Sequence, residues 1–397
     1  MSSKPKYFTS VLIIVLICIS CQETIKRNSN HIITYNLKEL PETTSVKLSD
    51  LGFVDIEYIP LESDEQCVIP EINDIIVGDG YYLTHFFTKV YLFKSDGSFV
   101  AKIGTEGRGP NEFTVVHDLD IDRKNHKIYL ADGWQERFHV YSEKGDYIKT
   151  IRTPIYAAIS FRFTNDGILC YNMNQFANVE NSYDLIDTSG RIIKSYPNRY
   201  PWNKVLQGTA IFEENLFYRF NNQLFKKEVY SDTVYMFENL DFKPHLVIEH
   251  GEKLLNTKAR SEMEALPLFE KYVNQKNIFE FGDYIYYEFG YNFKLGGNNF
   301  YRGFIGSKKD EFQTLINSEN GLINDLDGGP NICLKAIKDD NSIISWINPL
   351  KLKIIVNSIS FKNSTPKYPD KKQELEKLAN RLKETDNPVL IIVRLKK

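Results

Sequence analysis

Short alternating stretches of apolar and polar residues, separated by tight turns, dominate the chain beyond about residue 50. Three stretches share one hairpin pattern, in which an apolar strand, a glycine-containing turn and a second strand are centred on Gly97, Gly145 and Gly190. Glycine supplies the positive φ that a tight hairpin requires. A period of about 45 residues built from such hairpins predicts a β-propeller with four antiparallel strands per blade.

The second repeat contains a complete blade. We expect its strands at residues 118–122, 127–131, 137–141 and 146–151, with a turn at residues 123–126. Alternation along the second of these strands directs Ile128 and Leu130 to one face, as a half-buried strand requires.

Two segments are expected to be helical insertions, at residues 251–276 and 350–387. In the second, Leu375, Leu378 and Leu382 recur at helical spacing. The rest of the chain accommodates six blades of about 46 residues. Both insertions leave the propeller from loops that share one face, so we expect both on the side where a ligand binds.

The two ends of the propeller are expected to meet, because an open ring would expose strand edges. Residues 54–60 form one predicted strand, and residues 388–395 form an apolar strand at the C-terminus. We expect both in the sixth blade, with the N-terminal segment outermost. The predicted fold class is therefore all-β, a six-bladed β-propeller with two helical insertions.

The N-terminus resembles the signal peptide of bacterial lipoproteins. Lys4 and Lys6 precede an apolar run at residues 11–19, which is too short to span a bilayer. The run ends at Ser20-Cys21, as in a lipobox, and polar residues follow. We expect a signal peptide at residues 1–20, lipidation of Cys21, a tether at residues 21–50 and the propeller at residues 51–397. The alternatives are an ordinary cleaved signal and an uncleaved anchor.

Short motifs give the chain two resemblances to known families. Residues 103–113, with the sequence IGTEGRGPNEF, and residues 128–138 resemble the NHL-repeat pattern. Beyond residue 50 the chain resembles the six-bladed β-propeller lipoproteins of Bacteroides-type bacteria, through SDTVY at 231–235, NDLDGG at 324–329 and the tail from 363 to 390. The resemblance implies this fold and an outer-membrane lipoprotein, in a leaflet left open. It implies no particular activity, because propellers host many.

Composition narrows the class of protein. The 397 residues include 49 Lys and Arg against 52 Asp and Glu, a net charge of -3, with 42% hydrophobic residues. These ordinary globular values exclude wholesale disorder, and the absence of a basic block argues against nucleic-acid binding. Cys67, Cys170 and Cys333 are odd in number and far apart, so no disulfide framework is implied, and whether one pair bridges is open. We expect Cys170 and Cys333 to be buried.

No strong catalytic motif is present, and no cofactor or metal is expected. The seven histidines are scattered along the sequence, whereas a metal site needs three or four converging ligands. The acidic stretch at 325–329 lacks the twelve-residue calcium loop, which favours a tight turn. In the loop at 107–113, Arg108 could pair with an anionic ligand, but the glycines and proline favour a turn pinned by Glu112 and Phe113.

Propeller geometry predicts where a ligand would bind. Loops that join the fourth strand of a blade to the next blade, and the second strand to the third, share one face around the central channel. The candidate ligand-binding residues on such loops are Arg108, Asn111, His117, Trp134, Gln135 and Arg199.

These observations favour a non-enzymatic binding or scaffolding module, held at the membrane by its N-terminal lipid. Its partner would be a glycan, a peptide or an envelope protein. The alternative is a hydrolase or lyase with its site at the channel mouth, which would need channel-facing carboxylates such as Asp118 or Asp120. A third hypothesis is a subunit of a larger envelope assembly.

Overall fold

The computed structural model describes residues 32–153, 158–177, 179–203, 211, 213–294 and 301–396. Residues 33–397 form one compact unit. The expected signal peptide and Cys21 lie outside the described residues. Among the residues described, no helix is long and apolar enough to cross a membrane.

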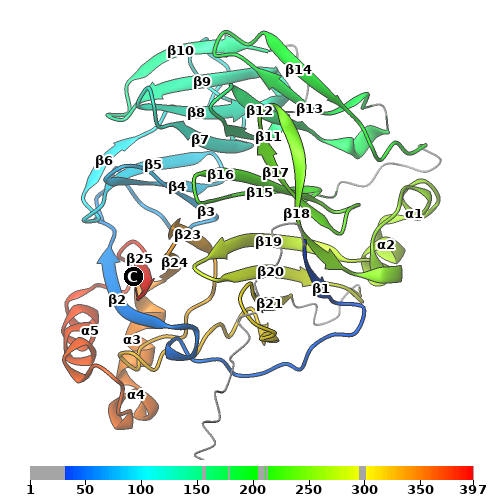
Figure 1. The fold of residues 1–397 in the computed structure, drawn as a ribbon. Coiled ribbons are helices and arrows are strands. Elements are labelled where there is room, and N and C mark those ends of the chain that lie inside the picture. The colour runs from blue at the N-terminus through cyan, green and yellow to red at the C-terminus, as the bar shows by residue number, and fades with distance from the viewer. Residues whose placement is uncertain are drawn as a thin grey trace, which may run out of the picture. The chain divides into compact units, whose positions relative to one another are not determined.

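Six antiparallel sheets form the six blades of a β-propeller (Figure 1). Blade 1 consists of β3 (Asp74–Val77), β4 (Tyr81–Phe86), β5 (Lys89–Lys94) and β6 (Phe99–Lys102). Blade 2 consists of β7 (Asp118–Asp122), β8 (Lys127–Asp132), β9 (Arg137–Ser142) and β10 (Tyr147–Arg152). Blade 3 consists of β11 (Ala158–Phe163), β12 (Ile168–Asn172), β13 (Asn181–Ile186) and β14 (Ile192–Pro197). The strands of blade 2 confirm the prediction to within one residue.

The second half of the ring adds three more blades. Blade 4 consists of β15 (Asn215–Phe220), β16 (Gln223–Glu228), β17 (Thr233–Glu238) and β18 (Asp241–Glu249). Blade 5 consists of β19 (Asn274–Phe281), β20 (Tyr284–Gly290), β21 (Arg302–Ser307) and β22 (Gln313–Asn317). Blade 6 consists of β23 (Ala336–Asp339), β24 (Ser342–Ile347), β25 (Val389–Leu395) and β2 (Phe53–Pro60).

The repeated hairpin glycines serve two purposes. Gly97, Gly145 and Gly190 have φ values of 90°, 89° and 91°, as the turns require. Each also lies against the outer strand of the preceding blade. A Cβ at Gly97 would lie 2.1 Å from the Pro60 carbonyl oxygen, and one at Gly190 would lie 2.2 Å from that of Arg152. Glycine therefore permits both the turn and the close approach of neighbouring blades.

The apolar core lies between blades. Ile128 and Leu130 are buried together, as predicted, against residues of blade 1. The intervening Tyr129 is also buried, on the opposite face, where it packs with Phe161 and Ile168 of blade 3. Strand β8 is thus covered on both faces, because each blade is sandwiched between two others.

The ring is closed by strands from both ends of the chain, as the sequence predicted. Strand β25 pairs with β24 on one side and with β2 on the other, both antiparallel. Residues 389–393 are almost completely buried. The N-terminal strand is the outermost of blade 6.

The segment before β2 differs from the expected tether. Strand β1 (Ile33–Asn36) adds to blade 4 as a fifth strand, parallel to β18. The chain then crosses to blade 5, where the Thr44 N–H donates to the Leu315 carbonyl at 2.9 Å, and it forms the short helix η1 (Ser49–Leu51). Residues 33–50 therefore belong to the propeller, because unpaired edges of blades 4 and 5 offer them backbone hydrogen bonds.

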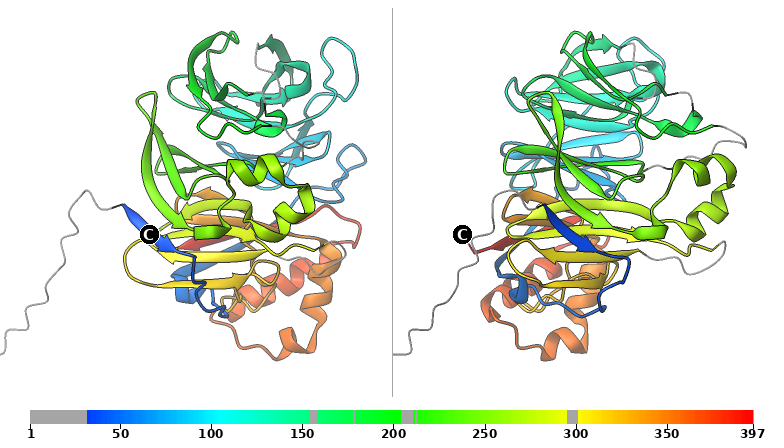
Figure 2. Two further views of the ribbon diagram at one scale, coloured as in Figure 1. Left: turned by 90° about the vertical axis from the view of Figure 1, so that its right-hand side faces the viewer. Right: turned by 45° about the vertical axis from the view of Figure 1, so that its right-hand side comes forward.

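Both expected insertions contain helices, and Figures 1 and 2 show them apart from each other. The first contains η4 (Gly251–Lys253), α1 (Thr257–Glu262) and α2 (Ala265–Lys271). The second contains α3 (Pro349–Asn357), α4 (Ile359–Asn363) and α5 (Pro369–Arg381). Helices α1 and α2 pack on Tyr200, Ile211 and Tyr230, in the loops that join β14 to β15 and β16 to β17. The first loop joins the fourth strand of blade 3 to blade 4, and the second joins the second and third strands of blade 4. Both classes of loop were expected to share one face of the propeller.

Candidate functional site

A cavity of about 1320 Å³ lies at the centre of the six blades. The first strand of every blade contributes to its wall, namely β3, β7, β11, β15, β19 and β23. This cavity is the central channel of the propeller, and most of its charged side chains already have partners.

The two channel carboxylates named by the sequence are both engaged in ion pairs. Asp118 lies 2.6 Å from the Arg162 guanidinium and accepts the Phe161 N–H at 2.8 Å. Asp120 pairs with Arg219 at 2.8 Å. Burial raises the pKa of Asp118, although the charge of Arg162 opposes this effect. The pairs connect the inner strands of blades 2, 3 and 4, so both carboxylates have a structural role.

His117 and Trp134 are brought into contact. Their rings meet edge to face at 5.3 Å, and His117 Nδ1 accepts the Gly133 N–H at 3.1 Å. Trp134 and Gln135 lie in the short helix η2 (Gly133–Gln135) and are exposed. Burial lowers the pKa of His117, which lines the channel cavity.

The loop at 107–113 folds around its own glutamate. Glu112 accepts the Gly109 N–H at 2.7 Å, and a Cβ at Gly107 would lie 2.0 Å from the Glu112 carboxylate. Phe113 is buried between blades 1 and 2. This geometry is the turn that the sequence favoured, and it leaves Arg108 and Asn111 exposed.

Arg199 lies in the loop between β14 and β15, with its guanidinium 5.7 Å from the centre of the Tyr235 ring. Of the six candidate residues, His117 alone lines the channel cavity. The other five line neither this cavity nor the smaller cavity beside α3.

The acidic stretch at 325–329 forms a turn that fastens the N-terminal segment. Asp325 accepts the Ser49 N–H at 3.1 Å, and Asp327 accepts the Gly329 N–H at 2.9 Å. Within the described part of the chain, no group of three or more His, Cys, Asp or Glu side chains is arranged to hold a metal.

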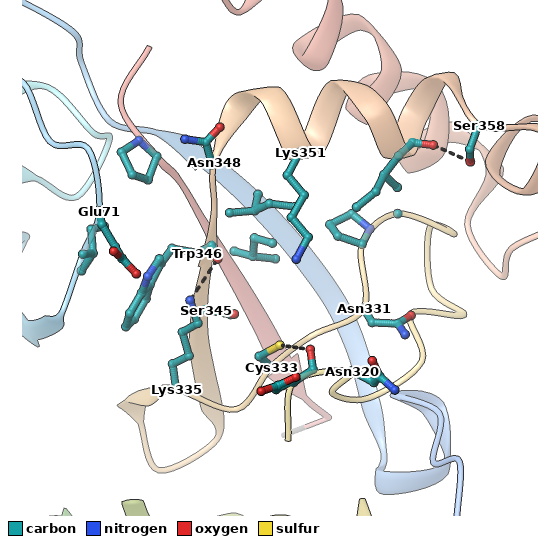
Figure 3. Close-up of a pocket in the computed structure, with 18 of the residues that line it drawn as sticks. Glu71, Asn320, Asn331, Cys333, Lys335, Ser345, Trp346, Asn348, Lys351 and Ser358 are labelled. Carbon is teal, nitrogen blue, oxygen red and sulfur yellow. Dashed lines mark hydrogen bonds between the residues drawn. The ribbon is translucent and has the colours of Figure 1, made fainter. Parts of the chain in front are cut away.

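A second cavity of about 620 Å³, which we call the α3 pocket, lies beside the channel between α3, β24 and two loops (Figure 3). The loops are residues 70–72, between β2 and β3, and residues 319–335, between β22 and β23. The pocket and the channel cavity share Glu71, Ile72, Glu319, Cys333, Lys335 and Trp346 in their walls.

Two lysines approach the α3 pocket from different elements. Lys351 extends from α3 into it, and Lys335 lies beside Trp346 on the adjacent wall (Figure 3). The Lys335 amine lies 4.1 Å from the centre of the Trp346 ring and donates a long hydrogen bond of 3.4 Å to the Trp346 carbonyl. Among the described residues, no carboxylate lies within ion-pair distance of either amine.

Burial lowers the pKa of Lys335 to about 8, and the nearby charges of Lys351 and Lys276 act in the same direction. Glu71 acts in the opposite direction. A negatively charged ligand would relieve the repulsion between these amines. The arrangement is therefore suited to hold an anion.

The three remaining cysteines are all unpaired. Cys170 is buried as expected, whereas Cys333 is only partly buried, because it lies in the wall of the α3 pocket. Its thiol donates to the Glu319 carbonyl at 3.2 Å, and burial raises its pKa, so the thiol stays protonated.

Lys335 and Lys351 were not among the predicted ligand-binding residues. They nevertheless lie in the two classes of connection that were expected to share one face of the propeller. Lys335 directly precedes the first strand of blade 6, and Lys351 follows the second strand of that blade. Applying that expectation to blade 6 would have named both residues. Their approach to one pocket depends on how α3 packs, which no local pattern indicates.

Comparison with solved structures finds proteins from Bacteroides that resemble this chain in fold. A structure of a protein from Bacteroides fragilis, which its description names as exported, superposes with a TM-score of 0.64 at 15% identity, covering 92% of this chain and 100% of that one. A member of the DUF4221 family from Bacteroides vulgatus gives a TM-score of 0.49 at 11% identity, covering 87% and 97%. At these identities the likeness concerns the fold. A search of curated proteins found no match.

The match to a sequence family is more extensive than the propeller repeat alone. It runs from residue 32 to residue 394, and so includes β1, both insertions and the closing strand β25. The chain belongs to the family described as domain of unknown function DUF4934.

Proposed function

We propose that this protein is a lipid-anchored binding module of the cell envelope, which holds an anionic ligand in the α3 pocket. One observation carries the proposal: Lys335 and Lys351 face the same pocket, and no described carboxylate pairs with either of them. Amines that line a cavity and have no carboxylate counter-charge favour an anionic ligand, because charge-assisted hydrogen bonds are stronger than neutral ones.

The remaining lining favours an acidic saccharide over the other ligands considered from the sequence. Trp346 offers an aromatic surface, and Asn320, Asn331 and Asn348 offer amides that both donate and accept hydrogen bonds. Glu71 and Glu319 also line the pocket and would repel a carboxylate. The carboxylate of the ligand should therefore point to the lysines, with its hydroxyl groups toward the amides and glutamates.

The enzyme alternative has less support. It needs carboxylates free to act at the channel mouth, and Asp118 and Asp120 are each paired with an arginine. Removing either carboxylate from its ion pair would leave a partly buried guanidinium without compensation, which is costly. A binding role requires no such change.

The cellular address rests on the N-terminal sequence and on the exported relative from Bacteroides fragilis. Lipidation of Cys21 and removal of residues 1–20 would hold the protein at the outer membrane. We expect Cys21→Ser to abolish incorporation of labelled palmitate. Incorporation that persists in this variant would contradict the assignment.

The ligand proposal is tested by calorimetry with galacturonic acid and galactose, which share a ring and differ in the carboxylate. We expect galacturonic acid to bind and galactose not to bind. Substituting Lys335→Met or Lys351→Met should weaken binding roughly tenfold or more, because each removes a charge-assisted hydrogen bond. Binding should also weaken as the pH rises through about 8, where Lys335 loses its proton.

Lys144→Met is the matched control, since Lys144 is exposed at the hairpin tip of blade 2. This variant should bind like the wild type. Equal binding of both sugars, or equal losses in all three variants, would refute a charge-selective site in the α3 pocket.

A further inference from the structure

The helices of the second insertion expose three large aliphatic side chains. Leu350, Ile354 and Ile359 have 44%, 62% and 80% of their surface exposed. Leu350 and Ile354 are four residues apart on α3, on the side opposite the buried Leu352 and Val356. Ile359 opens α4 directly after the bend at Ser358. The three form what we call the aliphatic patch, which is separate from the lining of the α3 pocket.

Apolar side chains exposed to water are a source of binding free energy, because moving them into an apolar environment is favourable. Nothing in the packing of α3 requires the exposed residues, because Leu352, Val356 and Phe361 already anchor the two helices in the core. Three such residues within ten positions therefore indicate a surface that a partner covers.

The same insertion is strongly basic. Residues 349–381 contain eight Lys or Arg against three acidic residues, a net charge of +5, whereas the whole chain carries -3. Several of these amines are held by carbonyl groups, which do not neutralise them. Lys353 donates to the Ala379 carbonyl at 2.9 Å, and Lys372 donates to the Ser364 carbonyl at 2.7 Å. Lys362 and Lys371 do pair with carboxylates, those of Glu376 and Asp55.

We propose that the α3–α4 surface docks on an anionic lipid bilayer, with Leu350, Ile354 and Ile359 inserted at the headgroup boundary and the lysines of the insertion next to lipid phosphates. Exposed aliphatic side chains on a basic helical surface are the combination that favours the membrane interface. Basic residues near an anionic bilayer surface are attracted to it, and salt weakens the attraction. The rest of the chain is acidic, so the attraction orients this insertion toward the membrane.

The test is vesicle flotation of residues 21–397 carrying Cys21→Ser, which lack both the expected signal peptide and the expected acylation site. One set of vesicles contains phosphatidylcholine with phosphatidylglycerol, and the other contains phosphatidylcholine alone. We expect flotation with the anionic vesicles, and little flotation with neutral vesicles or at high salt. The double substitution Ile354→Ser and Ile359→Ser should reduce the bound fraction at least roughly tenfold, because two apolar insertions are lost.

The matched control is Ile192→Ser with Ile193→Ser. These side chains are 47% and 49% exposed on β14, outside the insertion, and their loss should leave flotation unchanged. Equal effects of the two double substitutions, or no preference for anionic vesicles, would overturn the proposal. A dimer in solution that only the α3–α4 variant loses would also overturn it, since the patch would then cover a second copy. Galacturonic acid binding should be the same in both variants, which separates this inference from the proposed ligand site.

Discussion

Buried charges in this protein are satisfied by several partners at once, and Glu280 is the clearest case. Its carboxylate is completely buried, accepts the Tyr218 hydroxyl at 2.8 Å, and lies 2.7 Å from His245 Nε2 and 2.6 Å from the Lys308 amine. These groups come from four strands or loops of blades 4 and 5. The cluster therefore fixes two neighbouring blades to each other.

We expect Glu280→Gln to lower the free energy of unfolding by about 3–5 kcal/mol, because it removes the buried negative charge that pairs with the Lys308 amine. Urea denaturation measures this change. Asp283→Asn is the control, since Asp283 pairs with Lys309 in an exposed ion pair and its loss should cost less than about 1 kcal/mol. Equal losses of unfolding free energy in the two variants would show that burial does not strengthen the Glu280 ion pair.

The same carboxylate should make stability depend on pH. Burial acts to raise the pKa of Glu280, but the hydrogen bond from His245 and the charge of Lys308 outweigh it, so the pKa lies below its ordinary value. The stabilisation is therefore present above the ordinary pKa of a glutamate and is lost as the pH falls through the lowered one. Below about pH 4.3, the usual glutamate value, the wild type should lose unfolding free energy more steeply than Glu280→Gln.

At the scale of elements, the N-terminal segment is held by two kinds of contact. Tyr35, Leu37, Val46, Leu48 and Leu51 are buried in the main apolar core, and a few specific hydrogen bonds fix the segment near the surface. Strand β1 supplies four residues to the edge of blade 4, and Asp325 fixes η1 through Ser49. Neither contact is strong alone, because each is a small number of hydrogen bonds near the surface.

We expect Asp325→Ala to loosen the chain around η1, where Ser49 loses its hydrogen-bond acceptor, and to cost about 1–3 kcal/mol. Limited proteolysis with trypsin should then cleave faster at the exposed Lys47. In the control Asp310→Ala, the altered carboxylate belongs to the β21–β22 hairpin, where it accepts the Phe312 N–H at 3.0 Å. Cleavage at the same rate in both variants would show that Asp325 does not hold the segment.

At the scale of the whole molecule, closure of the ring decides whether the propeller is stable. Strand β25 has β24 on one side and β2 on the other, and its apolar residues are buried on both faces. Removing β2 would leave a long apolar strand with a free edge, which is a site of aggregation.

A chain that begins at residue 61 should therefore aggregate or unfold without a cooperative transition, whereas a chain that begins at residue 32 should keep the melting temperature of the full protein. Size-exclusion chromatography and thermal unfolding distinguish the two. A shortened chain lacking β2 that melts at the same temperature as the longer one would contradict closure by this strand.

The elements of the propeller were predictable because their signals are local. Hairpin turns at Gly97, Gly145 and Gly190 need a positive φ, which only a few residue types tolerate, and strand alternation marks the segments between them. The closing strand at the C-terminus was recognisable from its continuous apolar run. The second helical insertion was recognisable because apolar residues in it recur at helical spacing rather than at every second position, as at Leu375, Leu378 and Leu382.

The number of blades and the two insertions could be read from the sequence, because both depend on local periodicity. Closure of the ring was inferred from two predicted strands left at the two ends of the chain, since an open ring would expose strand edges. Tertiary structure alone decided that β1 joins blade 4, that Asp118 and Asp120 are paired with arginines, and that Lys335 and Lys351 meet in one pocket. These features join residues from different blades or from an insertion and a loop. Their distances are set by how separate elements pack, and no periodicity along the chain carries that information.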